Sequence, residues 1–358
     1  MRLIACIFSL LFGIFVIGNI VIVAQEVPVK ISQKDREGAI KSLSENIKRS
    51  YVFPDAAEKI AAKLKANAAT YASIDEGAAL AEALTRDIQS INGDKHLRVR
   101  FSPEVLPERK EISEPSAEEI KERVAFMKRV NFGFESVKRL DGNIGYIELR
   151  GFMDPAMGEN TVAAAMDFIA NTDALIFDLR RNGGGDPEMV QLICSYFFGD
   201  DPVHLNDLYW REGDQTKEFW TTPKVRGAKY LGKDIYILTS SRTFSGAEEF
   251  SYNLKNLKRA SIVGETTGGG AHPGGFFRLG DHFSAFISTG RAINPITKTN
   301  WEGTGVKPDV ETSADAAYNT AYLQAIEKSL KGTVDPDLKR ALSDLAERLR
   351  KELGKGAK

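Results

Sequence analysis

The sequence predicts an α/β protein with a helical domain at its N-terminal end. From Ile31 to about Asn92, apolar residues recur at helical spacing and no strand pattern occurs. After Asn131, short apolar runs alternate with amphipathic segments, which is the pattern of a sheet with crossover helices. The length of 358 residues is sufficient for a large core and for two domains.

Residues 1–24 have the pattern of a secretory signal peptide. Arg2 precedes an apolar stretch from Leu3 to Val23, and Ala24 completes a small-residue cleavage site. The protein is therefore expected to be exported to a periplasmic or extracellular location. Because about 20 apolar residues can span a bilayer, an uncleaved segment would instead anchor the chain in a membrane.

The helical domain is expected over residues 25–101. Three apolar stripes indicate helices, and Tyr51–Asp55 separates the first helix from the second. The stripes are Ile40, Leu43 and Ile47; Ile60, Ala61, Leu64 and Ala68; and Leu80, Leu84 and Ile88. Asn92-Gly93-Asp94 indicates a turn, and Leu97–Phe101 a short strand.

A linker and a helix are expected over residues 102–130, and the α/β core over residues 131–315. Ser102–Pro115 is rich in proline and glutamate, and Ala117–Val130 has a helical pattern. In the core, the predicted strands are Ile144–Leu149, Ala174–Leu179, Ile235–Leu238, Ser261–Val263, Phe283–Ser288 and one near Ile293. The predicted helices are Ala156–Ala170, Pro187–Phe198 and Ser245–Leu257. Residues 316–358 form a helical tail, with an amphipathic helix over Pro336–Leu353.

Composition and charge exclude some functions. The chain is 42% hydrophobic and 27% charged, and 48 basic against 49 acidic residues leave a net charge of −1. This balance does not favour binding to nucleic acid or to an acidic membrane surface. Cys6 leaves with the signal, so Cys194 has no partner for a disulfide and is expected to fill the core.

The stretch Thr239–Ser251, TSSRTFSGAEEFS, places six hydroxyl side chains where an apolar strand meets a helix. Ser245 would face the helix dipole and free amide groups, which suits a nucleophile whose attack creates an oxyanion. The tetrapeptide from Ser245 to Glu248 also has the S-x-x-E pattern of a capping box. From this stretch alone the cap is the favoured interpretation, because such boxes are common at helix starts.

A second strand–glycine–helix corner occurs at Asp178–Gly185, DLRRNGGG. Consecutive glycines let backbone amides turn toward an anion, although the Gly-Lys-Ser/Thr of a phosphate loop is missing. The alternative is a flexible turn before a helix with Pro187 in its first turn. The histidines are His96, His204, His272 and His282, and their spacing does not suggest a metal-binding pair.

Four motifs in order, DLRRNGGG, TSSRTFSGAEE, IVGETTGGGAHPGG and NWEGTGVKPDV, resemble the C-terminal-processing, or tail-specific, serine peptidases. The segment NFGFESVKRLDGNIGYIELRGF is similar to the branch that includes interphotoreceptor retinoid-binding protein, with tricorn protease a more distant relative. The resemblance covers about residues 90–315. It implies a ClpP/crotonase-like ββα spiral core.

The resemblance also implies roles for individual residues. The family's nucleophile lies three residues before a characteristic glutamate, which matches Glu248, so the nucleophile would be Ser245. The oxyanion hole would use the amide of Gly246 and one amide of the glycine loop, from Gly183 or Gly184.

The resemblance offers more than one candidate for the general base. Many tail-specific members use a lysine where this chain has Gly270. The tricorn-like alternative is a histidine, matched by His96 in INGDKHLRV, and a glutamate, matched by Glu302 in NWEGTGVKPD, which together with Ser245 give the expected triad. His272 is the rival base. Tricorn has a serine before its histidine, whereas this chain has Lys95, so a fourth catalytic member is in doubt. Apart from the resemblance, His96 could cap a strand and Glu302 could be an exposed loop residue.

These observations favour an exported serine peptidase with a site between the two domains. The expected partner is a polypeptide or peptide substrate; no nucleic acid, metal or organic cofactor is expected, and membrane contact only if the signal is uncleaved. About thirty residues between Phe101 and Asn131 are too few for a PDZ domain. Two other functions stay open: a module that binds apolar ligands and keeps a vestigial site, and a hydrolase of esters or small peptides.

Overall fold

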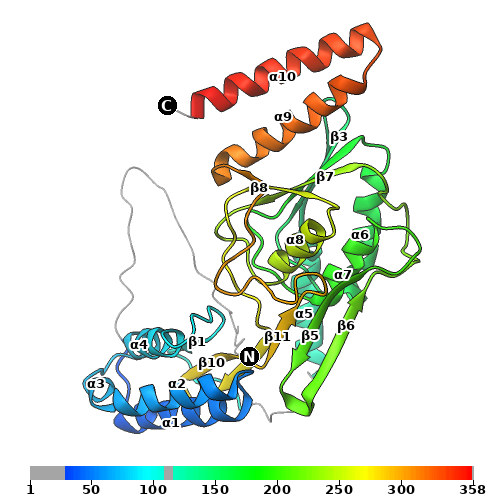
Figure 1. Ribbon diagram of the computed structural model, residues 1–358. Coiled ribbons are helices and arrows are strands. Elements are labelled where there is room, and N and C mark those ends of the chain that lie inside the picture. Colours follow the sequence, from blue (N-terminus) through cyan, green and yellow to red (C-terminus); the bar gives the residue numbers. More distant parts are fainter. Residues whose placement is uncertain (1–28, 109–115, 357–358) are drawn as a thin grey trace, which may run out of the picture.

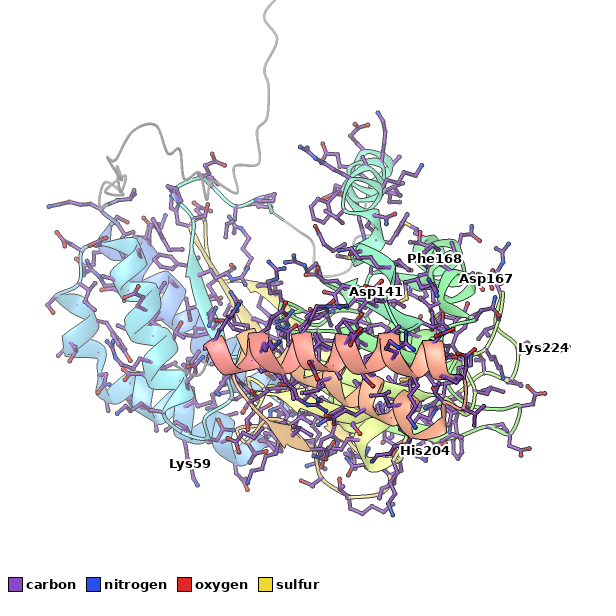
Figure 2. The ribbon with its side chains drawn as sticks, turned by 90° about the horizontal axis from the view of Figure 1, so that it is seen from above. Lys59, Asp141, Asp167, Phe168, His204 and Lys224 are labelled. Atoms are coloured by element: carbon purple, nitrogen blue, oxygen red, sulfur yellow. The ribbon has the colours of Figure 1, made fainter. Side chains whose placement is uncertain are left out.

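The computed structural model describes residues 29–108 and 116–356 (Figure 1). The predicted signal, residues 1–24 with Cys6, lies outside the described residues, as does part of the predicted linker. Figure 2, seen from above, shows the N-terminal helices with Lys59 at one side and the α/β part at the other. The fold is mixed α/β with a helical N-terminal region, as the sequence predicts.

The N-terminal region consists of four helices and a strand. The helices are α1 (Gln33–Ser50), α2 (Pro54–Ala66), α3 (Ala68–Ala72) and α4 (Gly77–Gln89), and the strand is β1 (Arg98–Phe101). The apolar stripes of α1, α2 and α4 meet in one core that includes Leu43, Leu64 and Leu84, each at most 1% exposed. The periodicity thus predicts the buried faces of these helices.

A strand pair from far along the chain completes this region. Strand β1 pairs antiparallel with β10 (Phe283–Ser288), which pairs with β9 (Gly274–Arg278). Ala285 and Ile287 of β10 belong to the same hydrophobic core as Leu84 of α4. Part of the predicted core segment therefore packs with the N-terminal helices.

The main sheet has six strands in the order β12-β8-β7-β4-β3-β2. Its strands are β2 (Phe134–Leu140), β3 (Ile144–Leu149), β4 (Ala174–Asp178), β7 (Asp234–Thr239), β8 (Ser261–Gly264) and β12 (Val310–Glu311). All neighbours are parallel except β2 and β3, which are antiparallel. Every residue of β4 is buried, which explains its continuous apolar run: the sheet is covered on both faces.

Helices cover the two faces of this sheet. One face packs on α6 (Pro155–Ile169), α7 (Pro187–Ser195) and α8 (Gly246–Asn256). The other packs on α9 (Ala314–Gly332) and α10 (Pro336–Gly356), the hairpin at the top of Figure 1. Alternate residues of β4 serve the two cores: Leu175 and Phe177 face the first, and Ala174 and Ile176 the second.

A third sheet has the antiparallel order β11-β5-β6. It contains β5 (His204–Trp210), β6 (Gln215–Trp220) and β11 (Gly290–Ile293). The remaining elements are α5 (Ala117–Arg129), η1 (Asn131–Gly133) and η2 (Glu212–Asp214). Because β10 and β11 are separated only by Thr289, this sheet continues directly from the sheet that carries β1.

No PDZ domain is present in the described chain: between Phe101 and Asn131 it forms only α5. Among the helices of residues 29–108 and 116–356, none is long and apolar enough to cross a membrane.

Candidate active site

Ser245 lies between β7 and α8 in an unusual backbone conformation. Its φ is 54° and its ψ is −123°, a region that side-chain-bearing residues rarely adopt. Holding a residue there costs on the order of 1–3 kcal/mol, and such strain concentrates at functional sites. A residue that only capped the helix would have an extended backbone, so this conformation favours the nucleophile interpretation.

The other hydroxyls of the stretch Thr239–Ser251 have structural roles. Four of them donate to backbone carbonyl oxygens: Thr239, Ser240, Thr243 and Ser251. Ser241 is exposed at the surface. Ser245 is half-buried, and among the described residues its hydroxyl donates to no carbonyl. The stretch thus contains four structural hydroxyls, the exposed hydroxyl of Ser241, and the half-buried hydroxyl of Ser245.

Glu248 joins the turn at Ser245 to a second glycine-containing segment, the glycine-rich loop of residues 266–275, TTGGGAHPGG. Its side chain is fully buried and accepts four hydrogen bonds of 2.5 to 2.9 Å. The donors are the Thr267 hydroxyl and the amides of Gly269, Gly270 and Ser245. Burial raises the pKa of Glu248 to about 7, against the effect of these donors, which favour the carboxylate. Glu248 therefore fixes the backbone of Ser245, and the capping box that the sequence predicts for Ser245 and Glu248 is present.

The predicted glycine loop lies against this turn. Gly184 has a φ of +103°, and a Cβ placed there would lie 2.7 Å from the Ser245 Cβ and from the Gly246 nitrogen, so only glycine fits. The Gly184 amide is already bonded to the buried side chain of Asn182, at 2.8 Å. The N–H groups of Gly183 and Gly246 have no partner in the described part of the chain. Of the two predicted loop amides, that of Gly183 is thus the available one.

His96 reaches the turn from the N-terminal region. It precedes β1, and its ring packs on Phe244, the neighbour of Ser245, at 4.6 Å, and on Phe286 of β10, at 5.6 Å. Burial lowers the pKa of His96 to about 4, although the nearby charge of Asp94 acts in the opposite direction. The imidazole is therefore neutral near pH 7 and able to accept a proton.

Glu302 and Asp94 both lie close to His96. One ring nitrogen of His96 and one carboxylate oxygen each from Asp94 and Glu302 lie within 4.8 Å of one another. The His96 Nδ1 and the Glu302 Oε1 are buried and have no hydrogen-bond partner. Burial also raises the pKa of Glu302. The two unpaired atoms are of the kinds that pair in a histidine–carboxylate couple, Nδ1–H as donor and Oε1 as acceptor.

The same three groups could approach a metal ion only after a rearrangement. Histidine and carboxylate are ligands that Zn²⁺ accepts, but tetrahedral bonds of about 2.1 Å need donor atoms about 3.4 Å apart. The separations of up to 4.8 Å would have to shrink.

A lysine base at position 270 does not fit this structure. A Cβ on Gly270 would lie 2.2 Å from the Phe244 ring and 2.7 Å from the Cε1 of His96. The space that a side chain would occupy is thus filled by the His96–Phe244 pair. In this chain, which lacks the lysine, the His96 ring lies next to the position that a side chain at residue 270 would occupy.

The other predicted residues have different positions. His272, the rival base, is buried and directs its Nδ1 toward Asp94, at 3.1 Å, and Glu302, at 3.4 Å. Lys95 donates to the carbonyl oxygen of Gly268, so it connects the N-terminal region to the glycine-rich loop.

Sequence reasoning missed Asp94, which it interpreted only as a turn residue. Asp94 is fully buried, and its Oδ1 accepts the backbone N–H of His96 at 3.0 Å. Burial opposes its ionisation, but the hydrogen bond and charge of His272, together with Ser288 and the charge of His96, lower the pKa of Asp94. Its position two residues before His96 is the one signal in the sequence that could have found it.

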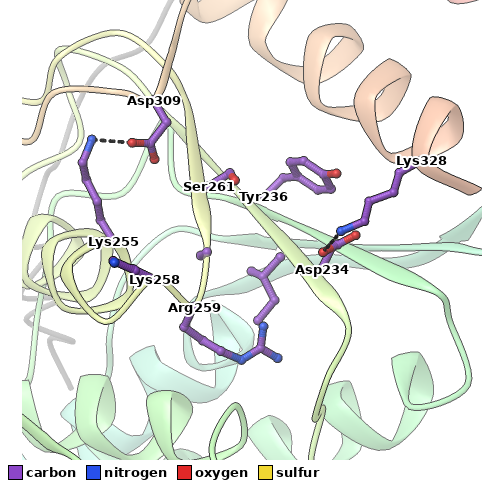
Figure 3. A pocket seen from close by; sticks show the side chains of 10 residues that line it. Asp234, Tyr236, Lys255, Lys258, Arg259, Ser261, Asp309 and Lys328 are labelled. Carbon is purple, nitrogen blue, oxygen red and sulfur yellow. Dashed lines mark hydrogen bonds and ion pairs between the residues drawn. The ribbon is translucent and has the colours of Figure 1, made fainter.

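A polar pocket of about 360 Å³ lies where β7 and β8 begin, at the end of these strands opposite to Ser245 (Figure 3). Its charged groups are largely paired: Lys255 with Asp309 and Lys328 with Asp234, each at 2.7 Å. Ser245 follows the other end of β7, so this pocket is not part of the site.

The geometry thus combines a strained serine, a neutral histidine, a carboxylate and two free amides beside a glycine loop. Comparison with known proteins identifies families that match two segments of the chain. Peptidase family S41 matches residues 143–312, and the N-terminal domain of Peptidase S41 in eukaryotic IRBP matches residues 24–135.

Two curated relatives have related names. The chloroplastic carboxyl-terminal-processing peptidase 2 of Arabidopsis thaliana is 28% identical over 169 residues, 46% of this chain and 31% of that protein. The carboxy-terminal processing protease CtpB of Bacillus subtilis is 22% identical over 210 residues, 58% of this chain and 42% of that protein. The chain therefore spans less than half the length of these relatives.

Solved structures share the fold. Mature CPAF has a TM-score of 0.55 at 13% identity and covers 87% of this chain and 98% of its own. The tricorn protease has a TM-score of 0.52 at 17% identity, covering 91% of this chain and 38% of its own. At these identities the likeness concerns the fold alone.

Proposed function

Residues 143–312 belong to peptidase family S41, and from this premise we propose that the chain is an exported serine peptidase with Ser245 as its nucleophile. The family supports a serine peptidase in general. The export follows from the predicted signal in residues 1–24. The observation that carries the choice of Ser245 is its strained backbone beside the glycine loop and the His96–Phe244 contact.

In the proposed reaction, the Ser245 Oγ forms a bond to the carbonyl carbon of the scissile peptide. His96 takes the hydroxyl proton, and Glu302 accepts the Nδ1–H of the resulting imidazolium. The carbonyl oxygen becomes an oxyanion, which the N–H groups of Gly246 and Gly183 stabilise. The proton then passes from His96 to the leaving amine, and water releases the acyl group by the same route.

The support for this arrangement is distributed over three parts of the site. His96 is neutral near pH 7, as a base must be. The His96 Nδ1 and the Glu302 Oε1 are unpaired and buried. Gly246 follows the nucleophile at the start of α8, where the first amides of a helix have no acceptor within it.

We propose polypeptides as the substrate class, by analogy with the two curated relatives, whose names specify carboxyl-terminal processing. The same acyl-transfer groups would also hydrolyse esters or small peptides. Incubation with an unfolded polypeptide and with a matched ester, followed by mass spectrometry of the products, separates these two substrate classes.

The first test is labelling of the full chain with a fluorophosphonate, which forms a bond between phosphorus and an activated serine oxygen and releases fluoride. We expect wild type to be labelled and Ser245→Ala to lose its labelling, because the serine oxygen that reacts is absent. His96→Ala should label at least about 100-fold more slowly, because general base catalysis contributes about 10²–10⁴-fold. Ser241→Ala is the matched control: this serine is exposed in the same stretch and should leave labelling unchanged. Folded wild type that stays unlabelled would contradict the proposal, as would a Ser245→Ala variant that labels normally.

A further inference from the structure

A second histidine, His272, lies buried between the two carboxylates of the site. Its Nδ1 is 3.1 Å from the Asp94 Oδ2 and 3.4 Å from the Glu302 Oε2. The side chains of His272 and Asp94 are 6% and 0% exposed, so water cannot substitute for these contacts. The Phe53 ring packs edge-on against the imidazole at 5.1 Å.

Asp94 is held rigidly by its other contacts. Its Oδ1 accepts the His96 amide, and its Oδ2 accepts the Tyr51 hydroxyl at 3.1 Å. Tyr51 in turn accepts from the side chain of Asn92, at 2.6 Å. A histidine bonded to Asp94 is therefore fixed relative to the backbone of His96.

His272 also changes the charge balance. Asp94 and Glu302 are like charges in a buried region, and Asp94 raises the pKa of Glu302. His272 acts in the opposite direction on both carboxylates, because its Nδ1 faces each of them. Without His272, Glu302 would retain its proton to a higher pH.

We propose that His272 is a positioning residue for the reaction at Ser245: it keeps Glu302 ionised and in place to accept the Nδ1–H of His96. The inference rests on the proposed function. His272 is not itself the base in this arrangement, because His96 is the histidine whose ring packs on Phe244, the neighbour of Ser245. Glu302 transmits the effect of His272 to the reacting groups.

The groups around His272 come from several elements. Asp94 and His96 lie between α4 and β1, and Glu302 between β11 and β12. The remaining neighbours are the Tyr51 hydroxyl on Asp94, the Phe53 ring after α1, and Arg291 of β11, whose guanidinium lies 5.7 Å from the centre of the Phe53 ring. Asp94 and Glu302 both contact His272 and both have an oxygen within 4.8 Å of a ring nitrogen of His96. Of the two carboxylates, only Glu302 has a buried oxygen, Oε1, without a hydrogen-bond partner.

The experiment measures the fluorophosphonate labelling rate of wild type, His272→Ala and His272→Gln from about pH 5 to about pH 9. His272→Ala should label at least about 10-fold more slowly at pH 7 and recover at higher pH, because its Glu302 loses the proton later. His272→Gln should recover part of the rate, since a carboxamide N–H can still donate to Asp94.

Two controls isolate the effect. His204→Gln makes the same chemical change at a histidine that also contacts a carboxylate, Asp207 at 2.6 Å, on the distant strand β5 (labelled in Figure 2), and should leave labelling unchanged. In a Glu302→Gln background, His272→Ala should add no more than about 2-fold, because the residue through which it acts is already neutral.

The outcomes separate the inference from the proposed function. If His272→Ala labels at the wild-type rate with an unchanged pH profile, the inference fails and the peptidase proposal stands. If His272→Ala lowers the labelling rate by the same factor at every pH, the inference also fails, since that indicates a structural role only. The same holds if His272→Ala lowers the rate as much in the Glu302→Gln background as in wild type. If His272→Ala does not fold, His272→Gln and the pH profile decide. Unlabelled wild type removes the proposed function and the inference together.

Discussion

At the scale of single residues, the chemistry depends on how burial changes ordinary side chains. His96 is shielded by Phe244 and Phe286, and the desolvation of its charged form lowers its pKa from 6.5 to about 4. A histidine with an exposed ring would be protonated below pH 6.5 and lost as a base. The site therefore keeps a neutral base under mildly acidic conditions.

This predicts the pH dependence of labelling in the wild-type protein. The rate should fall from its plateau only below pH 6.5, where Glu302, whose pKa is raised by burial, and then His96, whose pKa is about 4, take up protons. The measurement is the labelling rate against pH, with circular dichroism as a check that the protein remains folded. A midpoint at or above pH 6.5 would show that the base is a histidine in a more exposed environment than that of His96.

The same shift has a consequence for stability. Between pH 6.5 and about 4, the unfolded chain binds a proton at His96 that the folded chain does not. This group therefore lowers the free energy of unfolding as the pH falls through that range. Glu302 has the opposite sign, because its pKa is raised in the folded state.

Some residues of the site could be predicted from the sequence and others could not. Ser245 and Glu248 are visible because a strand corner, a helix start and a three-residue spacing are local features. Asp94 is not, since its burial depends on Tyr51 and His272, which are distant in the chain. The choice between Gly183 and Gly184 depends on one hydrogen bond to Asn182, which no pattern encodes.

At the scale of elements, burial on both faces explains what the sequence predicted best. Strands β3 and β10 have the bounds that their apolar runs predict, Ile144–Leu149 and Phe283–Ser288. Strands β2 and β6 were missed, because their exposed faces carry charged residues that dilute the apolar signal. Helix α9 was not predicted as a separate helix within the tail, since its buried face consists largely of alanines.

The hairpin of α9 and α10 gives a prediction at this scale. Leu345 of α10 is 7% exposed and packs in the core on the outer face of the main sheet. Leu345→Ala should lower the free energy of unfolding by about 2–4 kcal/mol, through lost burial and a residual cavity. Labelling of the folded protein should be kept, because the helix covers the sheet and contributes no group to the site.

Thermal unfolding and labelling at room temperature check this prediction. The matched control is Glu347→Ala on the exposed face of the same helix, which should leave the unfolding transition almost unchanged. Loss of labelling in folded Leu345→Ala would contradict the assignment of α10 to a covering role.

At the scale of the whole molecule, the site is assembled from segments that lie far apart in the described chain. His96 and Asp94 come from the N-terminal region, and Ser245 and Glu302 from the segment that matches family S41. The joint between them is the sheet of β1, β10 and β9, whose strands come from both. The sequence could not predict this joint, because the pairing of residues 98–101 with 283–286 depends on tertiary contacts.

The joint predicts that the two parts unfold together. Leu84 of α4 is fully buried in the core that also contains Ala285 and Ile287 of β10, so Leu84→Ala should destabilise the shared sheet by about 2–5 kcal/mol. The three tryptophans, Trp210, Trp220 and Trp301, all lie outside the N-terminal region and report on the other part. Their fluorescence transition should therefore move to lower temperature together with the helical signal from circular dichroism.

Leu338→Ala is the control, since this leucine is 48% exposed on α10 and should shift neither signal by much. If the two parts were independent, Leu84→Ala would move only part of the helical signal and leave the tryptophan transition in place. A joint transition would mean that damage to the N-terminal helices also displaces His96 from Phe244. The labelling rate should then fall over the same temperature range as the tryptophan signal, because the base and the nucleophile separate when the shared sheet opens.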